Sequence, residues 1–385
     1  MRRLRIALVV DTLGKGGNGT SNSAAQFAHE LERLGHEVRL VGVDAPDKRY
    51  RAREQYIPVV THFAKPHQLA FAHADTELFK TAFADVDLVH IYMPFSFGRA
   101  ALKYCKAHNI PVTAGFHVQP ENIVANAPFL GAIAHIIHHI YRWMWKGFYE
   151  DIEHIHVPTH MEERLLLING FTQHLHVFSN GYDDEAFTMR ESEPPLHKGK
   201  IVVASSGRLS SEKAQHTLIR AISLSKYKDD IELRLAGSGP LEKRLRLYAM
   251  MRLGWGKFFI GFIPHELMPN FLKKAHLLVH ASQADIEGIS VIEAMAVGVV
   301  PIIASSELSA AGDFALVEES LFPVGDARTL ARKIDWWIEH ADERKQWGRR
   351  YALHTQAHYS ISSSVQAFLR MAQEAINAKN ASEKA

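Results

Sequence analysis

Short apolar runs alternate with amphipathic stretches along nearly the whole chain, and this alternation restricts the fold more than any other feature. In the first half, apolar runs occupy residues 6–10, 37–43, 88–93, 111–116, 154–158 and 174–179. After a polar, proline-containing stretch, further runs occupy residues 201–207, 231–237, 258–262, 277–282 and 300–305. Strands that alternate with helices form right-handed βαβ units and parallel sheets. The sequence therefore predicts an α/β protein with two doubly wound, Rossmann-like domains.

The polar stretch at 190–200 separates the two series of runs. We expect an N-terminal domain over residues 1–190 and a C-terminal domain over residues 198–360. A chain of 385 residues, 47% of them apolar, is long enough for two domains. Ligands of such sheets bind outside the carboxyl ends of the strands, so we expect the site in a cleft between the domains.

Charge, cysteine content and the length of the apolar runs argue against a nucleic-acid-binding, a disulfide-bonded or a membrane-spanning protein. A net charge of +2 gives no general reason to expect nucleic-acid binding. The single Cys105 cannot form an internal disulfide, which favours a reducing compartment and a small core residue. The apolar run at 6–10 is too short for a signal peptide and is typical of a buried strand. No stretch offers the about 18–20 apolar residues that a membrane span needs.

A glycine-rich turn follows the first predicted strand. Gly14, Gly16, Gly17 and Gly19 separate that strand from a helix that opens near Thr20. Glycines let a backbone approach an anion, and a helix N-terminus offers free N–H groups. The spacing is neither the dinucleotide fingerprint nor a phosphate loop. A flexible strand-to-helix turn explains the glycines about as well.

Two cations follow the first strand of the second series, in "GRLSSEK" at 207–213. Arg208 offers a planar fork of donors and Lys213 a point charge, and together they suit a diphosphate. Taken alone, the pair is better explained as solvated surface charge. The next strand leads through Gly237 and Gly239 into a helix, and this turn would line the same edge of the sheet.

The stretch "ADIEGISVIEAMAVGVVPIIAS" at 284–305 places two acidic residues eight positions apart around a glycine. We expect a helix that begins at Ile289 or Ser290 and ends near residue 297. Asp285 would then lie in the preceding loop, and Glu293 would lie on the helix. Backbone N–H groups after Gly288 suit a phosphate or sugar oxygen, and two carboxylates suit vicinal hydroxyls. This layout suits a sugar nucleotide.

In their order along the chain, these motifs resemble those of the retaining glycosyltransferases of family 4, which have the GT-B fold. The segments concerned are "GRLSSEK", "AGSGPLE" at 236–242, the stretch at 284–305 and "SNGYDDEAF" at 179–187. The family also has the N-terminal glycine loop and a C-terminal helix that returns to the first domain, here expected at about 362–380. The chain departs from the family at Asp285, where the family usually has Glu, and this leaves the donor sugar open.

The resemblance implies transfer with retention from a nucleoside-diphosphate sugar, without a metal or another cofactor. His117 would contact the donor hexose, Arg208 and Lys213 would neutralise the leaving diphosphate, and Asp285 would meet the transferred sugar or its phosphate. Glu293 would meet the ribose. Further donor contacts are expected at Gly16, Gly17, Gly207, Gly239, Gly288, Ile289 and Ser290. The expected nucleotide is UDP.

The acceptor is indicated by two weaker features. "PFSFG" at 94–98 resembles "TPFSLG" in family members that glycosylate diacylglycerol. The stretch 128–152 reads as one amphipathic helix, with a cationic stripe opposite an apolar face and with Trp143 and Trp145 at the boundary. The cationic stripe comprises His135, His138, His139, Arg142 and Lys146, and the apolar face comprises Leu130, Ile133, Ile137, Ile140, Met144 and Phe148. A core helix with a solvated edge explains this pattern slightly better than a membrane-surface helix.

The sequence thus predicts a cytoplasmic glycosyltransferase, peripheral on the inner face of the membrane, that uses a lipid acceptor such as diacylglycerol or a glycolipid. A soluble or polysaccharide-precursor acceptor is the alternative. A non-catalytic sugar-nucleotide-binding protein or an epimerase fits the combined motifs less well.

Overall fold

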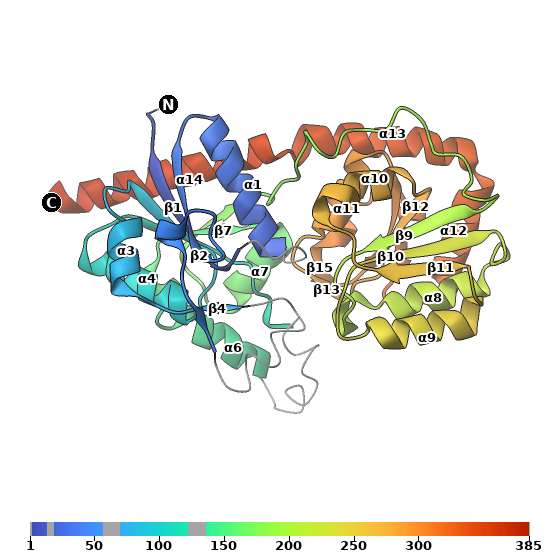
Figure 1. Ribbon diagram of the computed structural model, residues 1–385, viewed down its shortest axis with the longest axis horizontal. Helices are drawn as coiled ribbons and strands as arrows, with labels where there is room; N and C mark the ends of the chain where they lie inside the picture. Colours follow the sequence, from blue (N-terminus) through green and yellow to red (C-terminus); the bar gives the residue numbers. More distant parts are fainter. Residues whose placement is uncertain (1, 14–18, 57–69, 122–135, 385) are drawn as a thin grey trace. The chain divides into compact units, whose positions relative to one another are not determined.

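The computed structural model describes residues 2–13, 19–56, 70–121 and 136–384. The chain divides into two compact units, each with its own sheet and helices (Figure 1). The first unit comprises residues 1–120, 128–181 and 361–385, and the second comprises 121–127 and 182–360. Phe187 packs in the core of the second unit, so residues 182–190 lie with that unit and not with the first. Gly16 and Gly17 of the glycine loop lie outside the described residues.

The first unit is built on a six-stranded parallel sheet whose order is β2-β1-β5-β6-β7-β8. Its strands are β1 (Arg5–Thr12), β2 (Glu37–Val43), β5 (Leu88–Ile91), β6 (Val112–Gly115), β7 (His154–Val157) and β8 (His174–Val177). All six strands were predicted. The neighbours β1 and β5 pair in parallel, with Ile6 opposite Leu88. The strand order reverses between these two strands.

Helices cover both faces of this sheet. The helices are α1 (Gly19–Arg33), α3 (Thr76–Ala82), α4 (Ser96–Ala107), α6 (Ile136–Trp145), α7 (His160–Ile168) and α14 (Ile361–Lys384). Because successive strand residues point to opposite faces, Ile6 and Leu8 of β1 pack beneath α1 and α14, whereas Ala7 and Val9 pack in the core on the other face. Short elements complete the unit: η1 (Lys48–Tyr50), β3 (Glu54–Gln55), β4 (Phe71–Ala72) and η4 (Tyr149–Asp151).

The second unit repeats the design with the strand order β11-β10-β9-β12-β14-β16. The strands are β9 (Ile201–Ser206), β10 (Ile231–Ala236), β11 (Phe258–Gly261), β12 (Leu277–His280), β14 (Val300–Ser305) and β16 (Leu321–Pro323). A small parallel pair joins β13 (Ala284–Asp285) to β15 (Leu308–Ser309). Five of the six strands in the large sheet were predicted, and the three-residue β16 was not.

The helices of the second unit also lie on both faces of its sheet (Figure 1). Helices α8 (Gln215–Leu224), α9 (Glu242–Leu253) and α12 (Ala327–Glu339) pack together, as do α10 (Met268–Lys273), α11 (Ile289–Ala296) and α13 (Ala341–His358). The 3-10 turns are η5 (Ser211–Lys213), η6 (His265–Leu267), η7 (Ala310–Phe314) and η8 (Glu318–Ser320). Strands β9 and β12 are neighbours where the strand order reverses. The loops that follow them therefore meet at the point where doubly wound sheets bind ligands.

Candidate active site

The loop after β9 holds Arg208 against an acidic partner. Arg208 Nη2 lies 2.5 Å from Glu212 Oε1, and Ser210 donates its hydroxyl to the same carboxylate oxygen at 2.6 Å. Burial works to raise the pKa of Glu212, but Arg208 and Ser210 outweigh it and the pKa is lowered. Arg208 remains about one-third exposed while Glu212 is fully buried. Glu212 therefore holds the guanidinium group in place and leaves part of it exposed to a ligand.

Lys213, Asp285 and His280 form a second charged group at the same edge. Lys213 Nζ lies 2.5 Å from Asp285 Oδ2, and His280 Nε2 lies 3.0 Å from that oxygen. Burial works to raise the pKa of Asp285, but Lys213 and His280 hold it well below its usual range. Lys213 and Asp285 are 72 residues apart in sequence and meet because β9 and β12 are neighbours. Asp285 is thus an anion throughout the physiological range.

The two cations predicted to bind a diphosphate, Arg208 and Lys213, are therefore each already paired with a carboxylate. The cations Arg208 and Lys213 were predicted from the sequence, but Glu212 and His280 were not. The available signals were a Glu four residues after Arg208 and a His at the end of an apolar run. Because each cation is offset by an anion, a diphosphate bound at this edge would have to share Arg208 with Glu212 and draw Lys213 away from Asp285.

The glycines of this edge keep two loops in close contact. A Cβ added to Gly239 would lie 2.4 Å from the carbonyl oxygen of Leu209, and one added to Gly237 would lie 1.9 Å from that of Gly207. Leu209 N–H donates to the carbonyl of Ser238 at 2.9 Å across the same contact. Gly239, predicted as a donor contact, thus has a structural role in positioning the loop that carries Arg208.

Helix α11 begins as predicted. Gly288 precedes it with φ +86° and ψ +46°, a left-handed conformation that favours glycine. Ile289 and Ser290 form the first turn, whose N–H groups have no partner inside a helix. Two amides and the positive end of the helix dipole are therefore available to an anionic group.

Glu293 lies on the same helix and is buried. Burial, with a smaller contribution from Asp183, raises its pKa to about 8. His265 Nδ1 lies 4.0 Å from Glu293 Oε1, and burial lowers the pKa of that histidine. At neutral pH Glu293 is therefore mostly a neutral carboxyl group, in contrast to Asp285.

In the first unit, His117 follows β6 at the carboxyl edge of the sheet. Its ring is half-buried and stacks on Tyr92, with the ring centroids 5.0 Å apart. Its Nε2 atom is buried and has no hydrogen-bond partner among the described residues. Burial, and then the neighbouring His156 and His90, hold the pKa of His117 well below its usual range. A neutral imidazole of this kind can donate or accept one hydrogen bond from a sugar hydroxyl.

A small cavity lies at the strand-order reversal of the same unit. Asp11, Thr12 and Thr20 line it beside Met93 and Phe95, at the ends of β1 and β5. Burial raises the pKa of Asp11 to about 7. This buried acid was not predicted as a site residue, because in the sequence it only follows the apolar run at 6–10.

The predicted amphipathic helix is shorter than expected in the described residues. Helix α6 spans Ile136–Trp145, and the first part of the stretch lies outside the described residues. The apolar positions Ile137, Ile140, Met144 and Phe148 pack in the core of the first unit, so that face is not free for lipid. Trp143 is 54% exposed. The core-helix alternative therefore holds for the part of 128–152 that the structure describes.

Two family profiles together match most of the chain. Residues 17–186 match "Glycosyltransferase Family 4", and residues 188–353 match "Glycosyl transferases group 1". The chain belongs to the family 4 glycosyltransferases, which have the GT-B fold. It is a glycosyltransferase that acts on sugar-nucleotide donors. The family resemblance and the two Rossmann-like folds expected from the sequence are confirmed.

Known proteins similar to this glycosyltransferase include a lipid-modifying enzyme. The alpha-monoglucosyldiacylglycerol synthase of Streptococcus pneumoniae is 25% identical over 318 residues, which cover 78% of this chain and 71% of that protein. A sucrose-phosphate synthase from Thermosynechococcus elongatus has a TM-score of 0.79 at 17% identity, covering 98% of this chain and 100% of that chain. Anabaena HepE in complex with UDP-glucose has a TM-score of 0.69 at 16% identity, covering 97% and 99% respectively. These two structures are similar in fold.

Proposed function

We propose that this glycosyltransferase moves a hexose, with retention of configuration, from a UDP-sugar to a lipid acceptor such as diacylglycerol or a glycolipid, without a metal ion. The observation that carries the proposal is the meeting of Lys213, Asp285 and His280 at the strand-order reversal of the second unit. The similarity to a monoglucosyldiacylglycerol synthase supports the acceptor class, and the UDP-glucose complex of a protein with the same fold supports the nucleotide.

The donor diphosphate would be neutralised by a change of partners. When the bond between the anomeric carbon and the diphosphate breaks, the leaving UDP takes both electrons and its negative charge grows. Lys213 can turn from Asp285 to a phosphate oxygen, because its flexible stem carries a single compact charge. Arg208, held in place by Glu212, adds a fixed cation. Charge that is already positioned stabilises the transition state without reorganisation at the moment of reaction.

The two acids would then have different tasks. Asp285 remains ionised beside His280 after Lys213 leaves, so it accepts hydrogen bonds from hydroxyls of the transferred sugar. Glu293 is neutral at neutral pH and can both donate to and accept from the ribose hydroxyls. A neutral carboxyl group also adds no repulsion near a diphosphate.

Membrane association would use the outer edge of α6 and the end of α7. Trp143, Arg142 and Lys146 are exposed on or beside α6, and Leu167 and Ile168 are exposed on α7. His138 Nδ1 lies 3.2 Å from Asn169 Oδ1, which brings the end of α7 beside α6. Exposed cations with a few apolar side chains suit an anionic lipid surface. No helix in the described ranges is long and apolar enough to cross a bilayer.

A panel of donors and acceptors tests this function. Purified protein is incubated with UDP- and GDP-hexoses and with diacylglycerol, a glucosylated diacylglycerol, a sterol or a soluble oligosaccharide, each with and without EDTA. We expect lipid product from a UDP-sugar at the same rate in EDTA, with the donor's anomeric configuration retained by NMR. A strict requirement for Mg²⁺ or Mn²⁺ would contradict the metal-free mechanism, and exclusive use of a soluble acceptor would favour the alternative acceptor class.

A further inference from the structure

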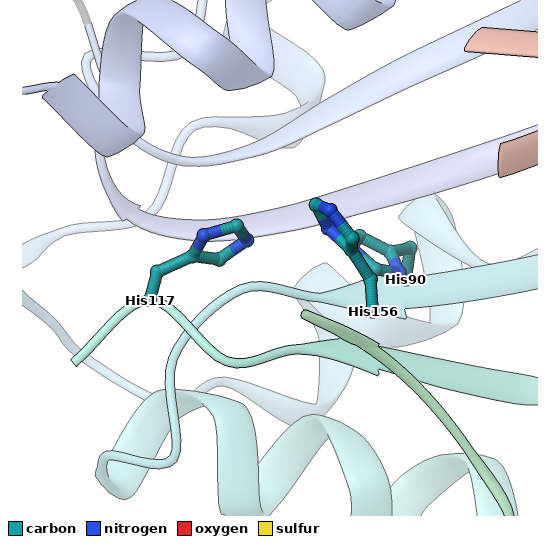
Figure 2. A group of neighbouring side chains, drawn as sticks. All are labelled: His90, His117 and His156. Carbon is teal, nitrogen blue, oxygen red and sulfur yellow. The ribbon is translucent and has the colours of Figure 1, made fainter. Parts of the chain in front are cut away.

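Three histidines of the first unit converge beneath helix α14. His90 belongs to β5, His156 belongs to β7, and His117 follows the strand between them, β6. Figure 2 shows the three rings turned toward one another. One ring nitrogen from each lies within 4.8 Å of one from each of the others. Of the three, only His117 was predicted as a site residue from the sequence.

The outer nitrogens of two of these rings are held by oxygen atoms. His156 Nε2 lies 2.8 Å from the carbonyl oxygen of Phe178, which can only accept, so this nitrogen carries the proton and Nδ1 keeps a lone pair. His90 Nδ1 lies 2.9 Å from Thr113 Oγ1, which leaves Nε2 as the inner atom. Metal-binding histidines are oriented in this way, by a carbonyl or another oxygen on the nitrogen that does not bind the metal.

Aromatic side chains pack against all three rings. His156 stacks on Phe178 with the ring centroids 3.8 Å apart, and His117 stacks on Tyr92 at 5.0 Å. Phe368 of α14 meets the ring of His90 edge-on at 5.1 Å. The described residues provide no hydrogen-bond partner for the buried Nε2 of His117. A cation at the centre would satisfy this nitrogen together with the inner nitrogens of His90 and His156.

The ligand set favours zinc among the metals that imidazole binds. Zinc takes nitrogen ligands at about 2.0–2.1 Å and readily leaves a fourth position open to water, which places tetrahedral nitrogens about 3.3 Å apart. The separations here are up to 4.8 Å, so the rings must close slightly. His117 can make this adjustment, because it lies in the loop after β6 and is only half-buried.

We propose that His90, His117 and His156 bind a single transition-metal ion, zinc in the first place, and that the bound ion inhibits the enzyme by holding His117 away from the donor. The inhibitory part rests on the proposed function and on the role that the family resemblance implies for His117, contact with the donor hexose. The binding part does not. Zinc is here a ligand that competes for one side chain, and the transfer reaction itself needs no metal.

A second group, His154, His176 and Glu374, provides an internal comparison. His154 Nδ1 lies 2.9 Å from His176 Nε2, and Glu374 Oε2 lies 4.0 Å from the latter. Here the two imidazoles already hydrogen bond to each other, and Glu374 is exposed. A His176→Gln variant therefore alters histidine content and the neighbouring strand without touching the proposed ligands.

The test measures zinc binding directly, by competition with a chromophoric chelator, on the metal-free full chain. We expect the wild type to bind one Zn²⁺ with sub-micromolar affinity, and Co²⁺ to give the intense visible bands of a four-coordinate site. His156→Gln and His90→Gln should each weaken binding by at least about 100-fold, whereas His176→Gln should bind like the wild type. Thermal stabilisation by UDP, a ligand expected in the second unit, is followed in each variant as a check on folding.

Inhibition is then measured as hydrolysis of the sugar donor. Zinc should lower turnover of the wild type and of His176→Gln, and it should have little effect on His156→Gln at the same concentration. Wild-type protein that binds zinc no more tightly than His156→Gln would overturn the site, as would an equal loss in His176→Gln. If zinc binds at the three histidines but donor turnover is unchanged, the inhibitory part is wrong. Absence of turnover with any sugar nucleotide in metal-free buffer would instead contradict the proposed function.

Discussion

At the scale of single residues, the structure distinguishes two acids that look alike in sequence. Asp285 and Glu293 are both buried or nearly so, yet Lys213 and His280 keep Asp285 ionised, while no cation among the described residues lies as close to Glu293. Their spacing around Gly288 was visible in the sequence. The difference in charge was not, because it depends on residues brought together by neighbouring strands.

Removal of either cation should slow turnover. Arg208→Ala and Lys213→Ala should each lower kcat by about 10²–10³-fold, because each deletes a charge positioned for the leaving diphosphate. Circular dichroism should show an unchanged fold. Lys345→Ala, which removes a surface ion pair with Asp342, is the matched control and should keep full activity. Near-normal kcat in both site variants would mean that the diphosphate binds elsewhere.

Substitutions of Glu293 and Asp285 should differ in their effects on UDP binding and on turnover. Glu293→Ala should weaken the binding of free UDP, because Glu293 is assigned to the ribose. Asp285→Asn should chiefly lower kcat, because Asp285 is assigned to the transferred sugar. Calorimetry with UDP and initial rates with the full donor measure the two effects. An equal loss of UDP affinity in both variants would contradict this division.

Glu293 should also make stability depend on pH. Its pKa rises from 4.5 to about 8 on folding, so the folded state binds the extra proton and stability falls as pH rises from about 4.5 to 8. Each pKa unit corresponds to about 1.4 kcal/mol, which predicts a loss of a few kcal/mol. Glu293→Gln should therefore melt higher than the wild type at pH 9 and similarly near pH 4.5.

Thermal melts over this pH range check the prediction, with the exposed Glu343→Gln as control. If Glu293→Gln and the wild type differ in melting temperature by the same amount at pH 9 and at pH 4.5, the carboxyl group of Glu293 is not protonated in the folded enzyme at neutral pH.

At the scale of elements, strands were predicted better than loops. The eleven apolar runs all form strands, because runs buried on both faces of a parallel sheet leave a continuous apolar signal. Strand β16 (Leu321–Pro323) escaped notice because three residues give no recognisable pattern. The apolar side of α6 was correctly identified, but its periodicity could not distinguish contact with a protein core from contact with lipid.

The close contact between the loops after β9 and β10 should not tolerate a methyl group added at Gly239. Gly239→Ala would place a Cβ 2.4 Å from the Leu209 carbonyl, so the loop that carries Arg208 must shift. We expect a lower melting temperature and weaker UDP binding together. Gly312→Ala, whose added Cβ would meet nothing closer than 3.9 Å, should change neither. Unchanged UDP affinity in Gly239→Ala would show that the loop position does not matter for the donor.

At the scale of the whole molecule, the sequence predicted two Rossmann-like sheets and the family, while the details of the acceptor side depend on tertiary contacts. The PFSFG segment begins α4, where Phe97 is buried in the core. Its resemblance to a lipid-transferase motif therefore involves packing residues as well as any acceptor contact. Burial of the apolar face of α6 likewise shifts the expected membrane contact from a broad apolar face to a narrow, mainly cationic edge.

This edge should bind anionic vesicles weakly and reversibly. Flotation with phosphatidylglycerol vesicles should recover the wild type, and recovery should fall as salt rises, because exposed charges are screened beyond about 10 Å at 0.1 M. A triple variant, Trp143→Ala, Lys146→Glu and Ile168→Glu, should float far less while keeping its affinity for UDP, since these positions are exposed and lie outside the second unit. Neutral vesicles and a Leu247→Glu variant, exposed on α9, are the controls. If wild type and triple variant float equally, the edge of α6 and α7 is not the membrane contact; if neither floats and the enzyme prefers a soluble acceptor, the lipid acceptor is wrong while the glycosyltransferase activity stands.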